Sequence, residues 1–133
     1  MTWKLFLDDD CDNARNPAIT VENPEWRTRM NLPHTPPDTG MSGEWILARS
    51  FAEAVHAMSA KGLPGFVSFD HDLGDGKDGI AVAHWMIESD MDGNRIPQDF
   101  AFEVHSGNPV GRENIRRLLD NYLFFRAKAH PEP

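Results

Sequence analysis

Three short apolar segments of this chain each end in a cluster of polar side chains, and this layout limits the folds available to it. The clearest example is GFVSFDHDLG at 65–74, where an apolar run typical of a buried strand stops at Asp70. Carboxylates and imidazoles are costly to hold together where a buried strand emerges. The three clusters are Asp8-Asp9-Asp10, Asp70-His71-Asp72 and His105-Ser106.

The order of apolar and helical patterns predicts an α/β fold. We expect strands over 3–8, 44–49, 65–70 and 100–104, and helices over 51–61, 80–89 and from 109 through at least 123. Ser50 and Glu53 form a capping-box pattern before the first of these helices. Strands that alternate with helices favour right-handed crossovers and a parallel sheet. We therefore predict a three-layer fold with a four-stranded parallel sheet in the order 2-1-3-4, which places the three polar strand ends in one crevice.

The remaining segments are expected to be irregular. A proline-rich loop insertion covers about 11–43, and a short helix over 24–30, capped by Asn23, is expected within it. We expect a turn region at 91–99 and a frayed tail over 127–133.

Size and charge restrict the classes of function. The 133 residues fit one domain over 1–133, and the net charge of −8 argues against binding to duplex nucleic acid. The single cysteine, Cys11, cannot form an internal disulfide, and no apolar run reaches membrane-spanning length. We therefore expect a cytoplasmic protein that does not bind membranes, and its oligomeric state is left open.

The acidic residues at the strand ends are candidate ligands for a divalent cation. Carboxylates that converge repel one another, and a hard cation resolves this repulsion. Asp8, Asp9 and Asp70 are the leading candidates, whereas Asp72 is either a further ligand or a brace for the following loop. Asp9 and Asp10 have a simpler alternative as turn formers or helix caps.

The two histidines at the strand ends are candidates for proton transfer. The ordinary pKa of imidazole lies near neutral pH, so His71 and His105 are suited to roles as general base and general acid, with Asp70 as the third candidate catalytic residue. They are equally suited to ligating a transition metal beside the carboxylates. The alternative for each is a structural hydrogen bond.

A second set of residues is suited to holding a phosphate. Ser106 and Asn108 precede an expected helix N-terminus, which offers N–H groups to an anion, although both side chains are also ordinary helix caps. Arg112 lies in the first turn of that helix. Arg15 in the long loop and Arg49 at a strand end offer guanidinium groups, with surface ion pairs as the alternative.

Several segments spread over nearly the whole chain form a specific combination. They are LFLDDD (5–10) with Arg15 and Pro17, WILARSFAEA (45–54), VSFDHDLG (67–74), DG (78–79) and VHSGNPVGRENI (104–115). In this combination the chain resembles the cyclic-phosphate processing receiver domain family. The resemblance implies a receiver/flavodoxin-like fold and metal-dependent chemistry on a cyclic phosphate or a related nucleotide.

The resemblance also implies roles for single residues. By position, Asp8 and Asp9 match the acidic pair of a receiver, Asp70 matches its phospho-acceptor, and Ser106 lies near its conserved hydroxyl. The chain departs from a signalling receiver because nothing after Ile115 reads as a fifth strand that ends in lysine. His71 and His105 have no role in phosphorelay, so a phospho-switch is the weaker interpretation.

Two hypotheses of function follow. In the first, the protein is a metal-dependent phosphoesterase, a hydrolase of the cyclic phosphodiesterase type, which uses Mg²⁺ or Mn²⁺ and acts on a small cyclic phosphate or cyclic nucleotide. In the second, it is a non-catalytic pseudo-receiver that binds a nucleotide or a protein partner, for example in a phage or mobile-element setting.

Overall fold

The computed structural model describes residues 3–9, 17, 20–30, 32, 45–70, 78–105 and 109–129. Its strands are β1 (Lys4–Leu7), β2 (Trp45–Ala48), β3 (Phe66–Phe69) and β4 (Ala101–Val104). Its helices are α1 (Pro24–Arg29), α2 (Phe51–Lys61), α3 (Gly79–Gly93) and α4 (Pro109–Ala129). Each strand lies inside the range expected from the sequence.

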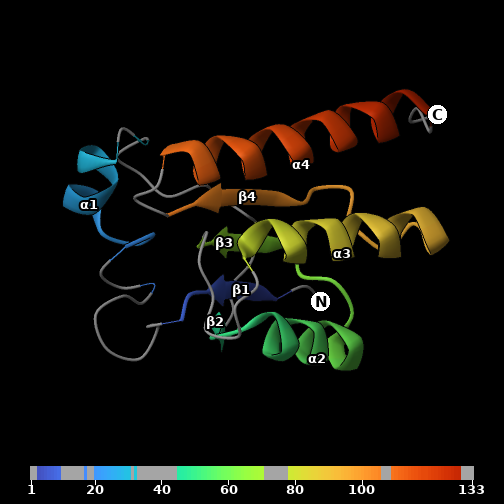
Figure 1. The fold of residues 1–133 in the computed structure, drawn as a ribbon, viewed down its shortest axis with the longest axis horizontal. Helices are drawn as coiled ribbons and strands as arrows, with labels where there is room; N and C mark the ends of the chain where they lie inside the picture. The colour runs from blue at the N-terminus through green and yellow to red at the C-terminus, as the bar shows by residue number, and fades with distance from the viewer. Residues whose placement is uncertain are drawn as a thin grey trace.

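The four strands form one parallel sheet in the order β2-β1-β3-β4, as predicted. The arrowheads of β1, β3 and β4 point the same way in Figure 1, and β2 is parallel to β1. The carboxyl ends of the strands therefore share one edge of the sheet, and α1 lies beyond that edge. β4 is the last strand on its side. The part of the chain described after it is the helix α4, and no fifth strand occurs among the described residues.

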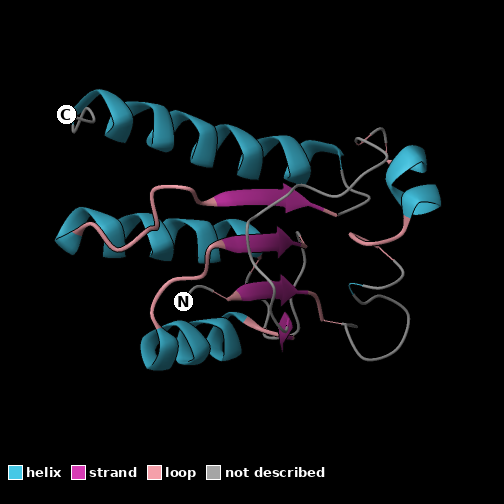
Figure 2. Cartoon of the chain, turned by 180° about the vertical axis from the view of Figure 1, so that it is seen from behind, coloured by secondary structure: helices cyan, strands magenta, loops and turns pink. Residues whose placement is uncertain are grey.

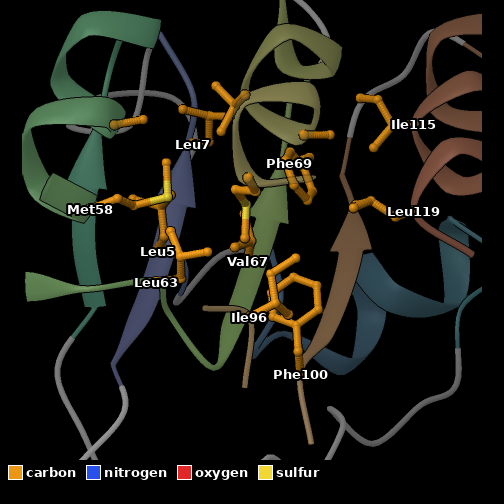
Figure 3. Close-up of a cluster of buried hydrophobic side chains, with 14 of the residues drawn as sticks. Leu5, Leu7, Met58, Leu63, Val67, Phe69, Ile96, Phe100, Ile115 and Leu119 are labelled. Atoms are coloured by element: carbon orange, nitrogen blue, oxygen red, sulfur yellow. The ribbon is translucent and has the colours of Figure 1, made fainter. Parts of the chain in front are cut away.

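One face of the sheet is covered by α2, α3 and α4. In Figure 2, which shows the molecule from behind, the strands lie in front of α3. Alternate strand residues such as Leu5, Leu7, Val67 and Phe69 are fully buried against these helices. Figure 3 shows how Met58, Ile115 and Leu119 complete this cluster from the helical side. This core holds the strands in register and so holds their carboxyl ends together.

The opposite face of the sheet carries a smaller cluster and a buried ion pair. Phe6 and Phe66 pack with Val21, which lies just before α1. Arg27 of α1 is fully buried and binds both carboxylate oxygens of Glu103 on β4, at 2.6 and 2.7 Å. Its guanidinium also donates to the carbonyl oxygen of Val21. Removing one partner of such a pair costs about 3–5 kcal/mol, so this contact fastens α1 to the sheet.

The helix boundaries follow from their caps. Ser50 accepts a hydrogen bond from the Glu53 amide, and Asn23 accepts from the first turn of α1, as the sequence predicted. Two boundaries differ from the prediction. The expected turn region at 91–99 begins later, because α3 continues to Gly93 and is closed by Asn94 at φ 53°. The expected fraying from 127 is wrong for 127–129, which belong to α4.

A polar network anchors the ends of α3 and α4 to the loop before β4. The buried carboxylate of Asp90 accepts hydrogen bonds from the Ile96 amide (2.8 Å), the Tyr122 hydroxyl (2.6 Å) and Arg126 (3.2 Å). Arg126 also donates to the Ile96 and Pro97 carbonyl oxygens. These bonds give a physical reason for the extra length of both helices. Among the described residues, no helix is long and apolar enough to cross a membrane.

The network shifts two pKa values. Burial raises the pKa of the Asp90 carboxyl, but hydrogen bonds from Tyr122, the Ile96 amide and Arg126 outweigh it, so this pKa lies below its usual value. Burial, and then the hydrogen bond to Asp90, raise the pKa of Tyr122 to about 12. Because the pKa of Tyr122 is higher in the folded than in the unfolded protein, its contribution to stability is complete below pH ~10 and is lost as the pH rises towards 12.

Tyr122 is the only tyrosine of the chain, so its ionisation can be followed directly by ultraviolet absorbance. We expect a midpoint near pH 12 in the folded protein, and a free energy of unfolding that falls from pH ~10 upwards. The Tyr122→Phe variant should lack this fall and be about 1 kcal/mol less stable at neutral pH, because one hydrogen bond is lost. An ordinary tyrosine midpoint in the folded protein contradicts this account.

Candidate functional site

Backbone hydrogen bonds extend the parallel ladder one residue beyond three of the strands. The amide of Asp8 donates to the Ala48 carbonyl oxygen (3.0 Å) and that of Asp70 to Leu7 (2.9 Å). The amide of His105 donates to Phe69 at 2.8 Å. Successive strand residues face opposite sides of a sheet. The side chains of Asp8, Asp70 and His105 therefore share the face of Phe6, Ser68 and Glu103, opposite the face covered by α2, α3 and α4.

His105 is held from several sides. Its Nε2 lies 2.8 Å from Oδ2 of Asp8, and its Nδ1 lies 2.7 Å from Oγ of Ser68. Its ring stacks on Phe6 with centroids 4.5 Å apart and planes within 3°, and Trp26 of α1 approaches at 6.5 Å. Neither His105 nor Asp8 exposes any of its side chain. Rotation of the imidazole would break two hydrogen bonds in a buried setting, so its orientation is fixed.

The three strand ends bring together side chains of the types that ligate cations. Single donor atoms of Asp8, Asp70 and His105 all lie within 4.8 Å of one another, and all three residues are buried. Two carboxylate oxygens and one imidazole nitrogen suit Mn²⁺ and neighbouring transition metals, whereas Mg²⁺ prefers oxygen ligands alone. Ser68 is placed behind the imidazole as the partner that orients a metal-binding histidine. The residues present therefore fit a divalent cation.

Of the other residues predicted from the sequence, three are described and do not belong to this group, and the rest lie outside the described residues. Asp9 is exposed beside Asp8 and does not join the group, so its role as a ligand stays a prediction. Arg49 is exposed at the end of β2, and Arg112 lies in the first turn of α4 beside β4. The residues outside the described part of the chain are Asp10, Arg15, His71, Asp72, Ser106 and Asn108.

Sequence reasoning missed three residues that support the site. Ser68 and Glu103 were read as parts of apolar strands, and Arg27 was not considered. In the sheet Ser68 is paired with Glu103, so the two polar side chains are neighbours on the face that carries His105. Each of these two apolar runs contains one polar residue. Because successive strand residues face opposite sides of the sheet, such a residue marks the more polar face of its strand, and this was the signal available in the sequence. Nothing local distinguished Arg27 from the exposed arginine Arg29 of the same helix.

Gly79, the first residue of α3, is placed against the backbone of the site. A Cβ atom at this position would overlap the carbonyl oxygen of Asp70 and also crowd Ile115. Only glycine allows α3 to pack this closely on the end of β3. The position of Asp70 therefore depends on the absence of a side chain at residue 79.

The parallel sheet and the acidic strand ends define a receiver-like α/β domain. The sequence model of the cyclic-phosphate processing receiver domain matches residues 3–121. The chain belongs to this family.

Comparisons with other proteins add little to this assignment. No curated protein matches the chain significantly. One similar solved structure is the receiver domain of the Erythrobacter litoralis response regulator PhyR, with 19% identity over 99% of this chain and 94% of that chain and a TM-score of 0.38. Another is a chain in which a trimeric coiled coil of yeast Spc42 is fused to another protein, with 16% identity over 98% of this chain and 85% of that chain and a TM-score of 0.47. These scores are too low to carry an argument.

The close packing at Gly79 can be tested with a matched pair of substitutions in α3. Gly79→Ala should displace Asp70 and lower the free energy of unfolding by about 1–3 kcal/mol, the usual cost of overpacking. Gly93→Ala is the control, because its nearest neighbour is the flexible Arg95 side chain at 3.3 Å. We expect Gly93→Ala to be neutral or stabilising, since alanine favours helix more than glycine does. Equal stability of the two variants in urea denaturation would contradict the proposed packing.

Proposed function

We propose that this protein is a metal-dependent phosphoesterase that hydrolyses a cyclic phosphate or cyclic nucleotide. The observation that carries the proposal is the buried group of Asp8, Asp70 and His105 at the three strand ends. The family description, which refers to cyclic-phosphate processing, supports the class of substrate. We further propose that the protein is cytoplasmic, which is consistent with its single cysteine.

In this proposal Asp8, Asp70 and His105 hold one divalent cation, Mn²⁺ or Mg²⁺. The bound cation supplies Lewis-acid polarisation of a phosphoryl oxygen and a water of lowered pKa. Asp8 also fixes the imidazole through the 2.8 Å contact with Nε2, while Ser68 holds Nδ1. A ring nitrogen that donates to Asp8 has no lone pair for a cation, so ligation by Nε2 would replace this hydrogen bond. Nδ1 stays with Ser68, which leaves neither ring nitrogen to donate a proton to the substrate.

In this proposal, other residues transfer the protons and bind the phosphate. His71, directly after Asp70 in the chain, is the candidate base that takes a proton from the attacking water. The water oxygen bonds to phosphorus as the bond from phosphorus to one ring oxygen breaks, and the released oxygen takes the proton that His71 accepted from the water. Arg112 is the candidate anchor among the described residues. Arg15, Arg49, Ser106 and Asn108 remain candidates for the same task, with Asp9 and Asp72 as further candidate ligands.

The proposal predicts that each of the three cation ligands is essential for turnover. Asp70→Asn, Asp8→Asn and His105→Ala should each lower turnover of nucleoside 2′,3′-cyclic phosphates by about 100-fold or more, because each removes a cation ligand. Turnover would be followed by phosphorus NMR in the presence of Mn²⁺ or Mg²⁺, and circular dichroism would show that each variant is folded. Asp92→Asn, an exposed change near the end of α3, is the charge-matched control and should leave turnover unchanged.

Two outcomes would overturn this assignment. Full turnover by Asp70→Asn would exclude the group at the strand ends as the catalytic centre. Recovery of unchanged cyclic nucleotide in complex with the wild-type protein would instead favour the non-catalytic binding protein, the second hypothesis.

A further inference from the structure

A groove lies along the outer edge of β4, next to the candidate site. It has a volume of about 580 Å³, within the range of ~300–1,000 Å³ that is usual for small-molecule sites. β4 and Phe100 line its floor, Met30 and Leu32 line one side, and α4 lines the other side with Arg112 and Leu123. β4 and α4 lie side by side in both ribbon views (Figures 1 and 2). We call this feature the β4 groove.

The floor of the β4 groove offers peptide groups that no described residue uses. Ala101 and His105 donate their amides to β3, at the Gly65 and Phe69 carbonyl oxygens. Since hydrogen-bonding directions alternate along a strand, the N–H and C=O groups of Phe102 and Val104 face away from β3. Within the described part of the chain, no strand pairs with this edge. The groove therefore combines one apolar wall, formed by Met30 and Leu32, with a short row of alternating donors and acceptors. Its α4 wall is mostly charged, since Arg112, Glu113, Arg116 and Asp120 line it beside Leu123.

One end of the β4 groove lies at the carboxyl end of β4, the strand whose next residue is His105 of the candidate site. Val104 lines the groove and is followed directly by His105, and Glu103 is held in place by the buried Arg27. Arg112 lies in the first turn of α4, at this same end. Arg116 pairs with Glu113 and Asp120 on its own helix, whereas Arg112 forms no ion pair with the described residues. An unpaired, half-buried guanidinium beside the site is complementary to a phosphate.

We propose that the β4 groove binds the nucleoside part of the substrate, with the base against the edge of β4 and the phosphate directed by Arg112 towards Asp8 and Asp70. This inference rests on the proposed function and narrows its substrate to a nucleotide. A nucleobase is flat and largely apolar on its faces, so it suits the wall formed by Met30 and Leu32. Its edge alternates donors and acceptors, as the peptide groups of Phe102 and Val104 do.

The inference can be tested without turnover by amide NMR of the full chain in the presence of Mg²⁺. The probe is adenosine 3′-monophosphate, which has no cyclic ester to hydrolyse, and the comparison ligands are ribose 5-phosphate and inorganic phosphate. We expect saturable shifts of the Phe102 and Val104 amides with the nucleotide alone. All three ligands should shift the amides of Asp70 and His105.

A matched pair of arginine variants tests the contribution of charge. Arg112→Gln should weaken nucleotide binding by about tenfold or more, which is typical for the loss of a hydrogen bond to a charged group. Arg117→Gln, on the exposed side of the same helix, should leave binding unchanged. Equal effects of the two substitutions would show that only the net charge matters and would overturn the assignment of Arg112.

The remaining outcomes separate the inference from the proposed function. Shifts at Asp70 and His105 with no shift at Phe102 and Val104 would overturn the groove inference alone. Absence of any shift with all three ligands would count against both. Shifts of Phe102 and Val104 that depend on protein concentration without ligand would show that a second copy pairs with this edge, and would also overturn the inference.

Discussion

The candidate site depends on the parallel hydrogen-bond ladder continuing one residue past the ends of β1, β3 and β4. The amides of Asp8, Asp70 and His105 each donate to the neighbouring strand at 2.8–3.0 Å. These bonds place three chemically active side chains in one row and on one face, although they are far apart in the sequence. A shift in register by a single residue would turn each of them towards the helical core instead.

Two features outside the row hold it in place. On the helical face, Gly79 allows α3 to approach the carbonyl group of Asp70, and the apolar core packs beneath. On the other face, the buried pair of Arg27 and Glu103 fastens α1 to β4, two residues before His105. α1 has only six residues and would be marginal as an isolated helix, so its position depends on this contact. The site is therefore supported from both faces of the sheet.

Much of this arrangement could be predicted from the sequence, for identifiable reasons. The apolar runs have strand length and the helices have strong caps, so the order of elements and the order of strands followed from local patterns. The convergence of Asp8, Asp70 and His105 followed from the topology, because parallel strands bring their carboxyl ends to one edge. These predictions needed only local sequence and the general rule for parallel sheets.

The rest depends on contacts that local sequence does not encode. Arg27 resembles any helical arginine until the sheet places Glu103 opposite it. Asp90 and Tyr122 are 32 positions apart, and their hydrogen bond joins α3 to α4. The groove along β4 could not be predicted either, because it brings Met30 and Leu32 beside β4 and α4 from a distant part of the sequence. Local sequence patterns do not show which residues far apart in the chain come into contact.

The central claim is that Asp8, Asp70 and His105 form one cation site. Anomalous diffraction from crystals soaked in Mn²⁺ tests it most directly, because the signal locates the metal without reference to activity. The account predicts one peak within bonding distance of an oxygen of Asp8, an oxygen of Asp70 and a nitrogen of His105, and no such peak in the Asp70→Asn variant. A wild-type crystal with no peak at these residues, or with Mn²⁺ bound only at exposed carboxylates, would contradict it.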